Sequence, residues 1–562
     1  MRISIKSVFL CLLWVLSVQA QSDGLLQIND ELSQFLQRQQ TNGLLPASFL
    51  NHQPISVLEA KTALQTVLAQ KEKLSEADRK LLSFYLHEKQ DPSAKWLNKR
   101  LPFLYKNNHD FLETKGDDFG IQLNPIAYVG AGPGIFEETG KENTQKTVWR
   151  RTVGIRAAGH IGKGVFFETR LSGNVEQVPY PDLDGHPPRH AHFFYYLDYA
   201  GRTDNYDYFD AAGIAGYRSK HFEVRFGRDN NRWTDGVNSL LLSNYPSKYD
   251  QLQIRTTLGK RAQYVNLFAA FDDYSRPRLT NGMIPRRFAT FHELTLRIAK
   301  RLDVSVFESI VFSRPSETGK ELYNFDLTYL NPIIFYRSVE RDRGSPDNAL
   351  VGAQLAWQTR KKVRLYGQMI LDEFDGSELK ARNGYWANKY AGLLGFHWTG
   401  LPKTDVRMEA ASARPFLYTH FNPSTAYLHG DDILGLQSGP NSRTFLTKIH
   451  HLFNERLYGN LTLTYVQRGR NTDHKNEGAD PTISYNSTPQ LPRSDYGNEM
   501  LQGIRVNTLL VESRLSYRFF NTGFLDAGVI FQKEEDAVLG NKQYVLPFLQ
   551  YRIGLPYSFQ RY

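Results

Sequence analysis

Cysteine is almost missing from this chain, and its scarcity limits the possible chemistry. The 562 residues contain one cysteine, Cys11, which lies within an apolar run at the N-terminus that is typical of a signal peptide. Removal of that peptide leaves no cysteine, which excludes disulfides, a thiol nucleophile and a cysteine-ligated metal site. An excess of one charge is also missing, because 68 Lys and Arg face 58 Asp and Glu, for a net charge of +10. Without a concentrated basic stripe, nucleic acid is not an expected partner.

Hydrophobic runs long enough for a transmembrane helix are missing as well. The mean hydropathy of −0.47 excludes a helical membrane bundle, and the run Val8–Val18 is too short to span a bilayer as a helix. Arg2 and Lys6 precede this run, and Val18-Gln19-Ala20 fits a small-x-small cleavage site. We therefore predict a signal peptide over residues 1–20, cleaved near Ala20, and export of the mature chain.

Enzyme motifs are not recognisable either. The chain has no nucleophile elbow and no phosphate-cradling glycine loop before a helix. Asp372 and Glu373 are adjacent, so on a strand their carboxylates point to opposite faces. A metal site is conceivable at His429-Gly-Asp-Asp432 or at the histidines 186, 190 and 192, but neither group has a common ligand spacing, and solvated loops are favoured. We predict a non-enzymatic protein with no cofactor and no metal.

Aromatic residues and regular alternation are what the chain has in abundance. Phe, Tyr and Trp make up 13% of it. From about residue 119 onward, segments of about ten residues alternate apolar with polar side chains, as in 222–226, 252–258 and 351–358. One apolar and one polar face per strand are the signature of a transmembrane β-barrel, whereas soluble sandwiches alternate over shorter strands.

The connections between these segments alternate between short turns and long loops. Outer-membrane barrels have short periplasmic turns and long external loops, so we predict an all-β transmembrane antiparallel barrel with 16–20 strands. About nineteen candidate strands can be counted. An odd number conflicts with two periplasmic termini, so either one strand is missed, for which Leu240–Leu242 is a candidate, or one strand is wrongly split. The predicted long loops are 131–146, 272–287, 314–348, 373–388, 413–444 and 469–506.

The N-terminal part of the mature chain follows a different pattern. Ser56 and Glu59 form a capping-box pattern ahead of an apolar helical stripe, and Ser75 with Asp78 indicates a second helix start. We predict a small helical region over 21–115 and an outer-membrane barrel over 116–562.

Two predicted loops combine aromatic residues with planar polar side chains. One surrounds Trp233 and includes Asn238; the other runs from Arg414 to Tyr427. Sugar rings stack on aromatic faces while Asn and Arg bind hydroxyls and carboxylates, so this mixture could recognise a polysaccharide. The alternative is the belt of Tyr and Trp at the membrane interface, which such barrels share and which composition alone favours.

Several strings resemble those of a known family. The segments 329–340, 344–352 and 365–374, Gly227-Arg228 with Trp233, and Glu409 with 414–420 resemble the Wzi-like capsule-assembly outer-membrane proteins. The resemblance covers nearly the whole mature chain. It implies a barrel of 18 strands, a helical bundle at the periplasmic mouth, and a lectin-like, non-enzymatic role in holding surface polysaccharide. On this resemblance, residues 21–115 are a periplasmic helical plug region, and the barrel is not expected to be an open general porin. Thr234-Asp235-Gly236 and Leu436 depart from the family pattern and leave the identity of the glycan open.

We therefore predict an outer-membrane barrel that binds and anchors capsular or other surface polysaccharide. The predicted partners are that polysaccharide, outer-membrane lipids and other cell-envelope proteins. The alternative functions are an accessory protein for surface motility or protein secretion, or a porin-like channel. The predicted glycan-binding residues, which place aromatic faces beside Arg and Asn on long external loops, are Trp233, Asn238, Arg337, Arg341, Arg343, Arg414, Tyr418 and Tyr427.

Overall fold

The structure is a computed structural model of the chain. It describes residues 24–28, 30–45, 50–86, 92–106, 110–177, 195–197, 205–279, 281–314, 325–332, 347–360, 362–519 and 522–557. The predicted signal peptide, the histidines 186, 190 and 192, and the predicted glycan-binding Arg337, Arg341 and Arg343 lie outside the described residues. Within the described ranges, no helix combines the length and the apolar character needed to cross a membrane.

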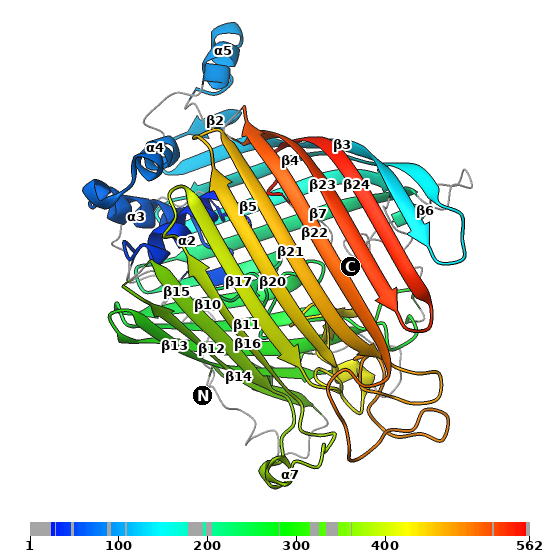
Figure 1. Cartoon of the computed structure of the whole chain (residues 1–562). Coiled ribbons are helices and arrows are strands. Elements are labelled where there is room, and N and C mark those ends of the chain that lie inside the picture. Colours follow the sequence, from blue (N-terminus) through cyan, green and yellow to red (C-terminus); the bar gives the residue numbers. More distant parts are fainter. Residues whose placement is uncertain are drawn as a thin grey trace, which may run out of the picture.

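Eighteen long antiparallel strands of the described residues close into one barrel, in which β24 pairs with β3 (Figure 1). This confirms the predicted fold class and strand number. Two short strands add to the wall: β2 (Leu112–Lys115) pairs with β3, and β6 (Tyr195–Leu197) pairs with β7. The eighteen are β3 (Phe119–Glu138), β4 (Thr144–Ile161), β5 (Val165–Gln177), β7 (Asn205–Arg218), β8 (Phe222–Asp229), β10 (Tyr249–Leu258), β11 (Ala262–Asp272), β12 (Arg286–Ala299), β13 (Leu302–Phe312), β14 (Asn348–Gln358), β15 (Val363–Leu371), β16 (Tyr390–Trp398), β17 (Thr404–Ala413), β20 (Ser442–Leu452), β21 (Leu457–Arg470), β22 (Ile504–Arg518), β23 (Gly523–Asp536) and β24 (Gly540–Ile553).

The alternation of the sequence places apolar side chains outside the barrel and polar ones inside it. On β10, Gln253 and Arg255 point into the lumen and are buried there. Outward side chains such as Phe226 and Leu394 are instead 69% and 73% exposed. A soluble barrel would have the opposite arrangement, so this wall is built to face lipid.

The two ends of the barrel differ in the length of their connections. At the short-turn end, adjacent strands are joined by a few residues, as at 162–164 and 259–261. At the long-loop end, the connections include 230–248, 414–441 and 471–503. The Leu240–Leu242 segment belongs to one of these loops and is not a strand, so that candidate for the missed strand was wrong.

The predicted long loop at 131–146 was also wrong, because β3 and β4 continue through most of it. Only residues 139–143 connect them. The Gly- and Pro-rich stretch 130–134 reads as a loop, yet it lies within β3. The pairing of β3 with β24 is interrupted between Ala131 and Ile135, where Pro133 and Pro547 have no N–H to donate to a ladder. The wall tolerates this local gap, while the β3–β4 ladder is continuous.

The helical region lies at the short-turn end (Figure 1). Its helices are α2 (Glu31–Thr41), α3 (Val57–Leu68), α4 (Glu76–Tyr85) and α5 (Pro92–Arg100). Both predicted helix starts are confirmed: Ser56 and Glu59 form a complete capping box before α3, and the Ser75 side chain accepts from the Asp78 backbone N–H before α4. Helix α7 (Gly376–Ala381) lies at the opposite, long-loop end.

One connection folds back over the outside of the barrel. Residues 325–332, here called the outer strap, include a short 3₁₀ helix, η3 (Leu327–Leu330), and lie on the wall formed by β11–β14. Phe325 lies 5.2 Å from Phe312 between ring centroids, and Tyr329 lies 4.6 Å from the same ring. The Tyr264 hydroxyl, which also points outward, donates to the carbonyl of Pro332.

Beside the outer strap, the outward wall carries a row of polar side chains where lipid-facing strands are normally apolar. Asn266, His292 and Glu308 are register partners on β11, β12 and β13. Their exposed fractions are 3%, 1% and 0%. The His292 Nδ1 lies 2.7 Å from the Asn266 Oδ1. This row is therefore hydrogen-bonded and covered rather than exposed to lipid.

Candidate functional site

The N-terminal segment enters the barrel lumen and pairs with a loop from the opposite end. Strand β1 (His52–Gln53) forms a two-stranded sheet with β9 (Arg232–Trp233), which belongs to the loop 230–248. The His52 ring is fully buried. Its Nε2 lies 3.2 Å from the Glu293 Oε1, and its Nδ1 lies 3.0 Å from the Gln263 Oε1. The N-terminal segment and the loop 230–248 therefore meet inside the lumen.

Ion pairs hold this N-terminal segment to the barrel. Arg38 on α2 pairs with Asp405 on β17, and Arg255 on β10 lies 3.3 Å from Glu59 on α3. Burial alone would raise the pKa of Glu59, but the positive charges of Arg255 and its neighbours outweigh burial and lower that pKa to about 2. Glu59 is therefore ionised in the folded protein and stabilises the docked helix.

An apolar core fills the side of the lumen lined by β10–β17. Two long loops, 230–248 and 414–441, fold inward and pack against inward side chains of these strands. Trp233 contacts Phe291 and Phe307 edge-on, at 6.2 Å between ring centroids in each case. We call this the inner core; its larger members are Trp233, Leu240, Leu241, Leu242, Tyr249, Phe271, Phe291, Phe307, Tyr418, Tyr427 and Leu434.

Three of the predicted glycan-binding residues belong to this inner core. Trp233, Tyr418 and Tyr427 are each 0% exposed, so the expectation that they stand on the external surface was wrong. The Tyr418 and Tyr427 rings stack at 5.4 Å, and the Tyr418 hydroxyl donates to the Leu240 carbonyl. These residues hold the two inward loops together. Long loops over a wide barrel can fold into its lumen and bury their aromatic side chains there.

The other two predicted glycan-binding residues that the structure describes form hydrogen bonds within the protein. Asn238 donates through its side-chain amide to the Glu409 carboxylate at 2.9 Å. Arg414 donates through Nε to the Asn388 carbonyl at 2.9 Å, and its guanidinium lies 5.5 Å from the Tyr390 ring centroid. Both side chains are half-buried. Their role in binding a glycan stays a prediction.

Glu409 anchors the inward loop 230–248 to the barrel wall. Its carboxylate accepts hydrogen bonds from the backbone N–H groups of Val237 and Asn238, and from the Tyr366 hydroxyl at 2.8 Å. One lumen carboxylate therefore satisfies several donors that the inward fold of the loop would otherwise leave unpaired.

Replacement of Glu409 by alanine should therefore destabilise the loop. We expect the free energy of unfolding to fall by more than about 2 kcal/mol, since buried donors lose their acceptor. Denaturant unfolding of the purified protein measures this change. Glu409→Gln keeps one oxygen acceptor and is the matched control, for which a smaller loss is expected. Equal loss in both variants would contradict an anchoring role of the carboxylate.

The residues considered for a metal site at His429 form a tight hairpin inside the lumen. β18 (Leu428–His429) pairs with β19 (Asp432–Ile433). The His429 Nδ1 accepts from the Asp272 backbone N–H at 3.0 Å, and its Nε2 lies 3.0 Å from the Ser247 hydroxyl. Among the described residues, no group of three potential metal ligands comes together. His429 thus connects three segments of the protein.

A second aromatic group lies at the long-loop end and reaches the surface. We call it the loop-end aromatic cluster: Tyr385, Trp386, Phe421, Tyr485 and Tyr496. Ring centroids of Trp386 and Tyr485 are 4.6 Å apart, and those of Tyr385 and Tyr496 are 5.5 Å apart. Tyr496 is 54% exposed and Phe421 is 40% exposed. The cluster thus combines rings fixed by packing with rings open to solvent.

Two cationic side chains lie against rings of this cluster. The Arg493 guanidinium lies 3.6 Å from the Trp386 ring centroid, and the buried Lys389 ammonium lies 4.3 Å from that of Tyr485. Burial lowers the pKa of the neighbouring His420 to about 3, and the charge of Lys389 acts in the same direction. His420 is therefore neutral near pH 7. Lys389 also pairs with Glu373 at 3.3 Å and Arg493 with Asp495 at 2.6 Å, so the cluster combines aromatic faces with paired charges.

The loop-end aromatic cluster was not predicted from the sequence. Its rings come from 372–389, 414–421 and 471–503, which are far apart in the chain. The adjacent Tyr385-Trp386 pair, inside a loop that also holds Asn383 and Gly384, was the available signal. Only the fold shows that Tyr485 and Tyr496, a hundred residues further along, pack on it.

Together, the closed antiparallel wall, its largely apolar outer face and the polar side chains that line much of its lumen define an outer-membrane β-barrel. Comparison with protein-family models and with curated protein sequences finds no match. Among solved structures, the fold is similar to that of Wzi of Escherichia coli, an outer-membrane protein involved in group 1 capsule assembly and described as a carbohydrate-binding β-barrel. The TM-score is 0.55 at 14% identity, over 95% of this chain and 100% of that one. The predicted resemblance is thus confirmed at the level of the fold.

Weaker similarity extends to barrels of Pseudomonas aeruginosa. OccK1 (OpdK) matches with a TM-score of 0.42 and OccK8 (OprE) with 0.39, each at 10% identity over 76% of this chain and 98% of that one.

Proposed function

We propose that this protein binds an extended surface polysaccharide at its long-loop end and holds it at the outer membrane, without catalysis. The observation that carries the proposal is the loop-end aromatic cluster, which offers exposed Tyr and Phe rings on a packed base. The fold it shares with a barrel described as carbohydrate-binding and involved in capsule assembly supports the same function. The accessory role in motility or secretion and the porin-like channel are the alternatives.

In this proposal the long-loop end faces outward and the short-turn end faces the periplasm. Outer-membrane barrels have this asymmetry. The helical region over 21–115 then closes the periplasmic mouth, and the apolar outward side chains contact outer-membrane lipids. The predicted cleavage near Ala20 belongs to the same proposal.

Binding at the cluster is expected to be weak at each contact and strong in sum. One stacking contact on an aromatic ring contributes on the order of 1 kcal/mol. A polysaccharide repeats its sugar unit many times, and a cell carries many copies of a surface barrel, so simultaneous contacts raise the retention of the chain greatly.

Replacement of Trp386 by alanine should release polysaccharide from the cell. Trp386 supports Tyr485 and the Arg493 guanidinium, so its loss removes the packed base of the cluster. We expect the variant to insert normally while several times more surface polysaccharide appears in the medium, measured by uronic acid or total sugar assay. Trp357→Ala, an outward-facing tryptophan on β14 that is 48% exposed, is the matched control.

Three results would decide against the proposal. Unchanged retention in Trp386→Ala cells, together with no binding of the isolated glycan to the purified barrel, would remove the cluster as the site. If cells that lack this protein keep their surface polysaccharide but lose surface movement or protein secretion, the accessory role is favoured. Large stable currents through the full-length protein would favour the channel.

A further inference from the structure

Positive charge gathers on three adjacent short turns of the barrel, which join β10 to β11, β12 to β13 and β14 to β15. These turns contain no acidic residue. All of their described cations are exposed, and within the part of the chain that the structure describes none of these side chains forms an ion pair or a hydrogen bond. We call them the cationic arc: Lys260, Arg261, Lys300, Arg301, Arg360 and Lys362.

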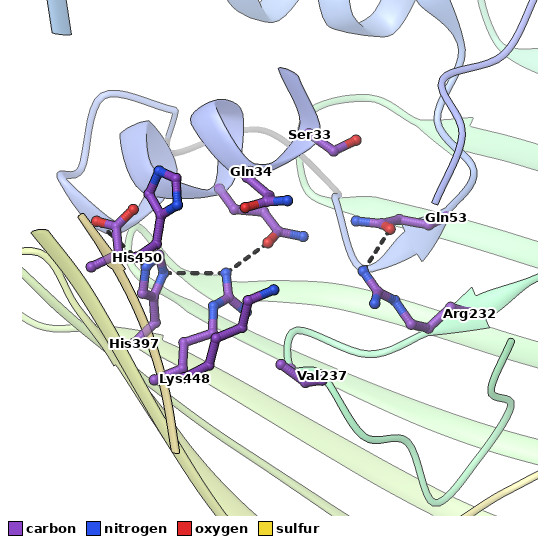
Figure 2. Close-up of a pocket in the computed structure, with 12 residues that line it drawn as sticks. Ser33, Gln34, Gln53, Arg232, Val237, His397, Lys448 and His450 are labelled. Atoms are coloured by element: carbon purple, nitrogen blue, oxygen red, sulfur yellow. Dashed lines mark hydrogen bonds and ion pairs between the residues drawn. The ribbon is translucent and has the colours of Figure 1, made fainter. Parts of the chain in front are cut away.

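Other arginines of the barrel, by contrast, have partners within the protein. Beside the lumen cavity between α2 and the wall, Arg232 donates to the Gln53 side-chain oxygen at 2.7 Å (Figure 2). At the long-loop end of the same sector of the wall, Arg228 and Arg286 lie 3.0 and 2.8 Å from the carboxylate oxygens of Asp250. The charge of the cationic arc therefore differs from these, because it is available to a partner outside the chain.

The backbone of each turn in the arc is fixed by the neighbouring strand. The Arg261 carbonyl accepts from the Arg297 N–H at 2.7 Å, and the Arg301 carbonyl accepts from the Gln358 N–H at 2.8 Å. The Lys362 carbonyl accepts at 3.0 Å from the N–H that follows β16. Adjacent strands are about 4.8 Å apart, so turns separated by two strands lie about 10 Å apart. The arc thus presents its cations at regular intervals on a rigid base.

The cationic arc borders the apolar outer face of the barrel. Large outward side chains just before these turns are Leu258 on β10, Ile298 on β12 and Trp357 on β14, which are 57%, 61% and 48% exposed. The end of an apolar belt lies where hydrocarbon meets lipid headgroups, and tryptophan is enriched at that level. Lys and Arg beyond the belt can lay their stems along apolar surface and keep their charged ends among the headgroups.

We propose that the cationic arc binds acidic phospholipids of the periplasmic leaflet through their headgroup phosphates. This inference rests on the proposed orientation, in which the short-turn end faces the periplasm. Each Lys or Arg near an anionic bilayer surface contributes attraction, and a guanidinium can bind two phosphate oxygens at once. Because the three turns belong to one sector of the wall, acidic lipids are enriched beside β10–β15.

The lipid selectivity of the purified full-length protein tests this proposal. In phosphatidylcholine vesicles, spin-labelled phosphatidylglycerol should associate with the barrel about threefold or more in preference to spin-labelled phosphatidylcholine, measured from the motionally restricted fraction of the spectrum. Salt screens exposed charges, so the preference should fall in about 1 M salt. The arc variant, Lys260→Gln, Arg261→Gln, Lys300→Gln and Arg301→Gln, should lose most of it. The control, which removes four exposed charges from the helical region and should keep the preference, is Lys71→Gln, Lys73→Gln, Lys95→Gln and Lys99→Gln.

Two outcomes would overturn the proposal. Equal association of the two lipids with the unaltered protein would show that no site for the acidic headgroup exists. A preference that persists in the arc variant would place the acidic lipid elsewhere on the barrel. Should that variant not fold, the double change Lys300→Gln with Arg301→Gln decides, and an undiminished preference rejects the site.

The same variants separate this inference from the polysaccharide proposal. The arc variant should retain surface polysaccharide on cells, whereas the purified Trp386→Ala protein should keep its preference for phosphatidylglycerol. Failure of either proposal is therefore distinguishable from failure of the other.

Discussion

Replacing Trp233 with alanine is expected to lower the free energy of unfolding by about 3–5 kcal/mol, the usual cost of removing a large buried aromatic side chain. Trp233 is fully buried, packs against Phe291 and Phe307, and contacts the His52 ring edge-on at 5.1 Å. The substitution therefore leaves a cavity where the inner core meets the N-terminal segment.

Denaturant unfolding followed by heat-modifiable migration measures this loss. Proteolysis of the intact variant adds a local measurement, because the weakened contact with His52 should make the N-terminal segment easier to cleave. Tyr496→Ala, at a ring that is 54% exposed, is the control and should change stability by less than about 1 kcal/mol. An unchanged midpoint for Trp233→Ala would contradict the packing of the inner core.

The second large effect concerns ion conductance. The N-terminal segment and the inner core both occupy the lumen, and they meet where β1 pairs with β9. Deletion of residues 25–106 alone should therefore raise the conductance in planar bilayers only slightly. The same deletion combined with Leu240→Ser, Leu241→Ser and Leu242→Ser, which weakens the inner core as well, should raise it at least severalfold.

Each component of this experiment has its own control. The triple serine variant without the deletion should conduct poorly, because the N-terminal segment still occupies part of the lumen. Leu365→Ser on the outward face of β15 tests whether a serine in the barrel wall is by itself enough to raise the conductance. A large rise from the deletion alone would show that the inner core does not obstruct the lumen.

The wall of the barrel was predictable because the pattern of each strand depends only on neighbouring residues in the sequence. A strand between lipid and water must alternate, so residues such as 222–226 and 252–258 show their two faces in the sequence. Helix starts at Ser56 and Ser75 were equally local, since a capping residue acts within its own turn. The family resemblance added the strand number of 18, which the alternation alone placed only within 16–20.

The interior was not predictable in the same way. Trp233, Tyr418 and Tyr427 follow strands at the long-loop end, where an aromatic residue can equally belong to a membrane-interface belt, a sugar-binding surface or a lumen core. Only the inward course of the loops shows that these aromatic residues belong to a core in the lumen. That course depends on contacts between distant segments, such as the pairing of His52 with Trp233, and no periodicity in either segment records it.

The outer strap has a consequence for how this barrel enters a membrane. Polar groups such as His292 and Glu308, at the middle of adjacent strands, cost several kcal/mol each if they face hydrocarbon without partners. Insertion of β11–β13 and packing of residues 325–332 against them should therefore occur together. The finished barrel has one flank already occupied by its own chain.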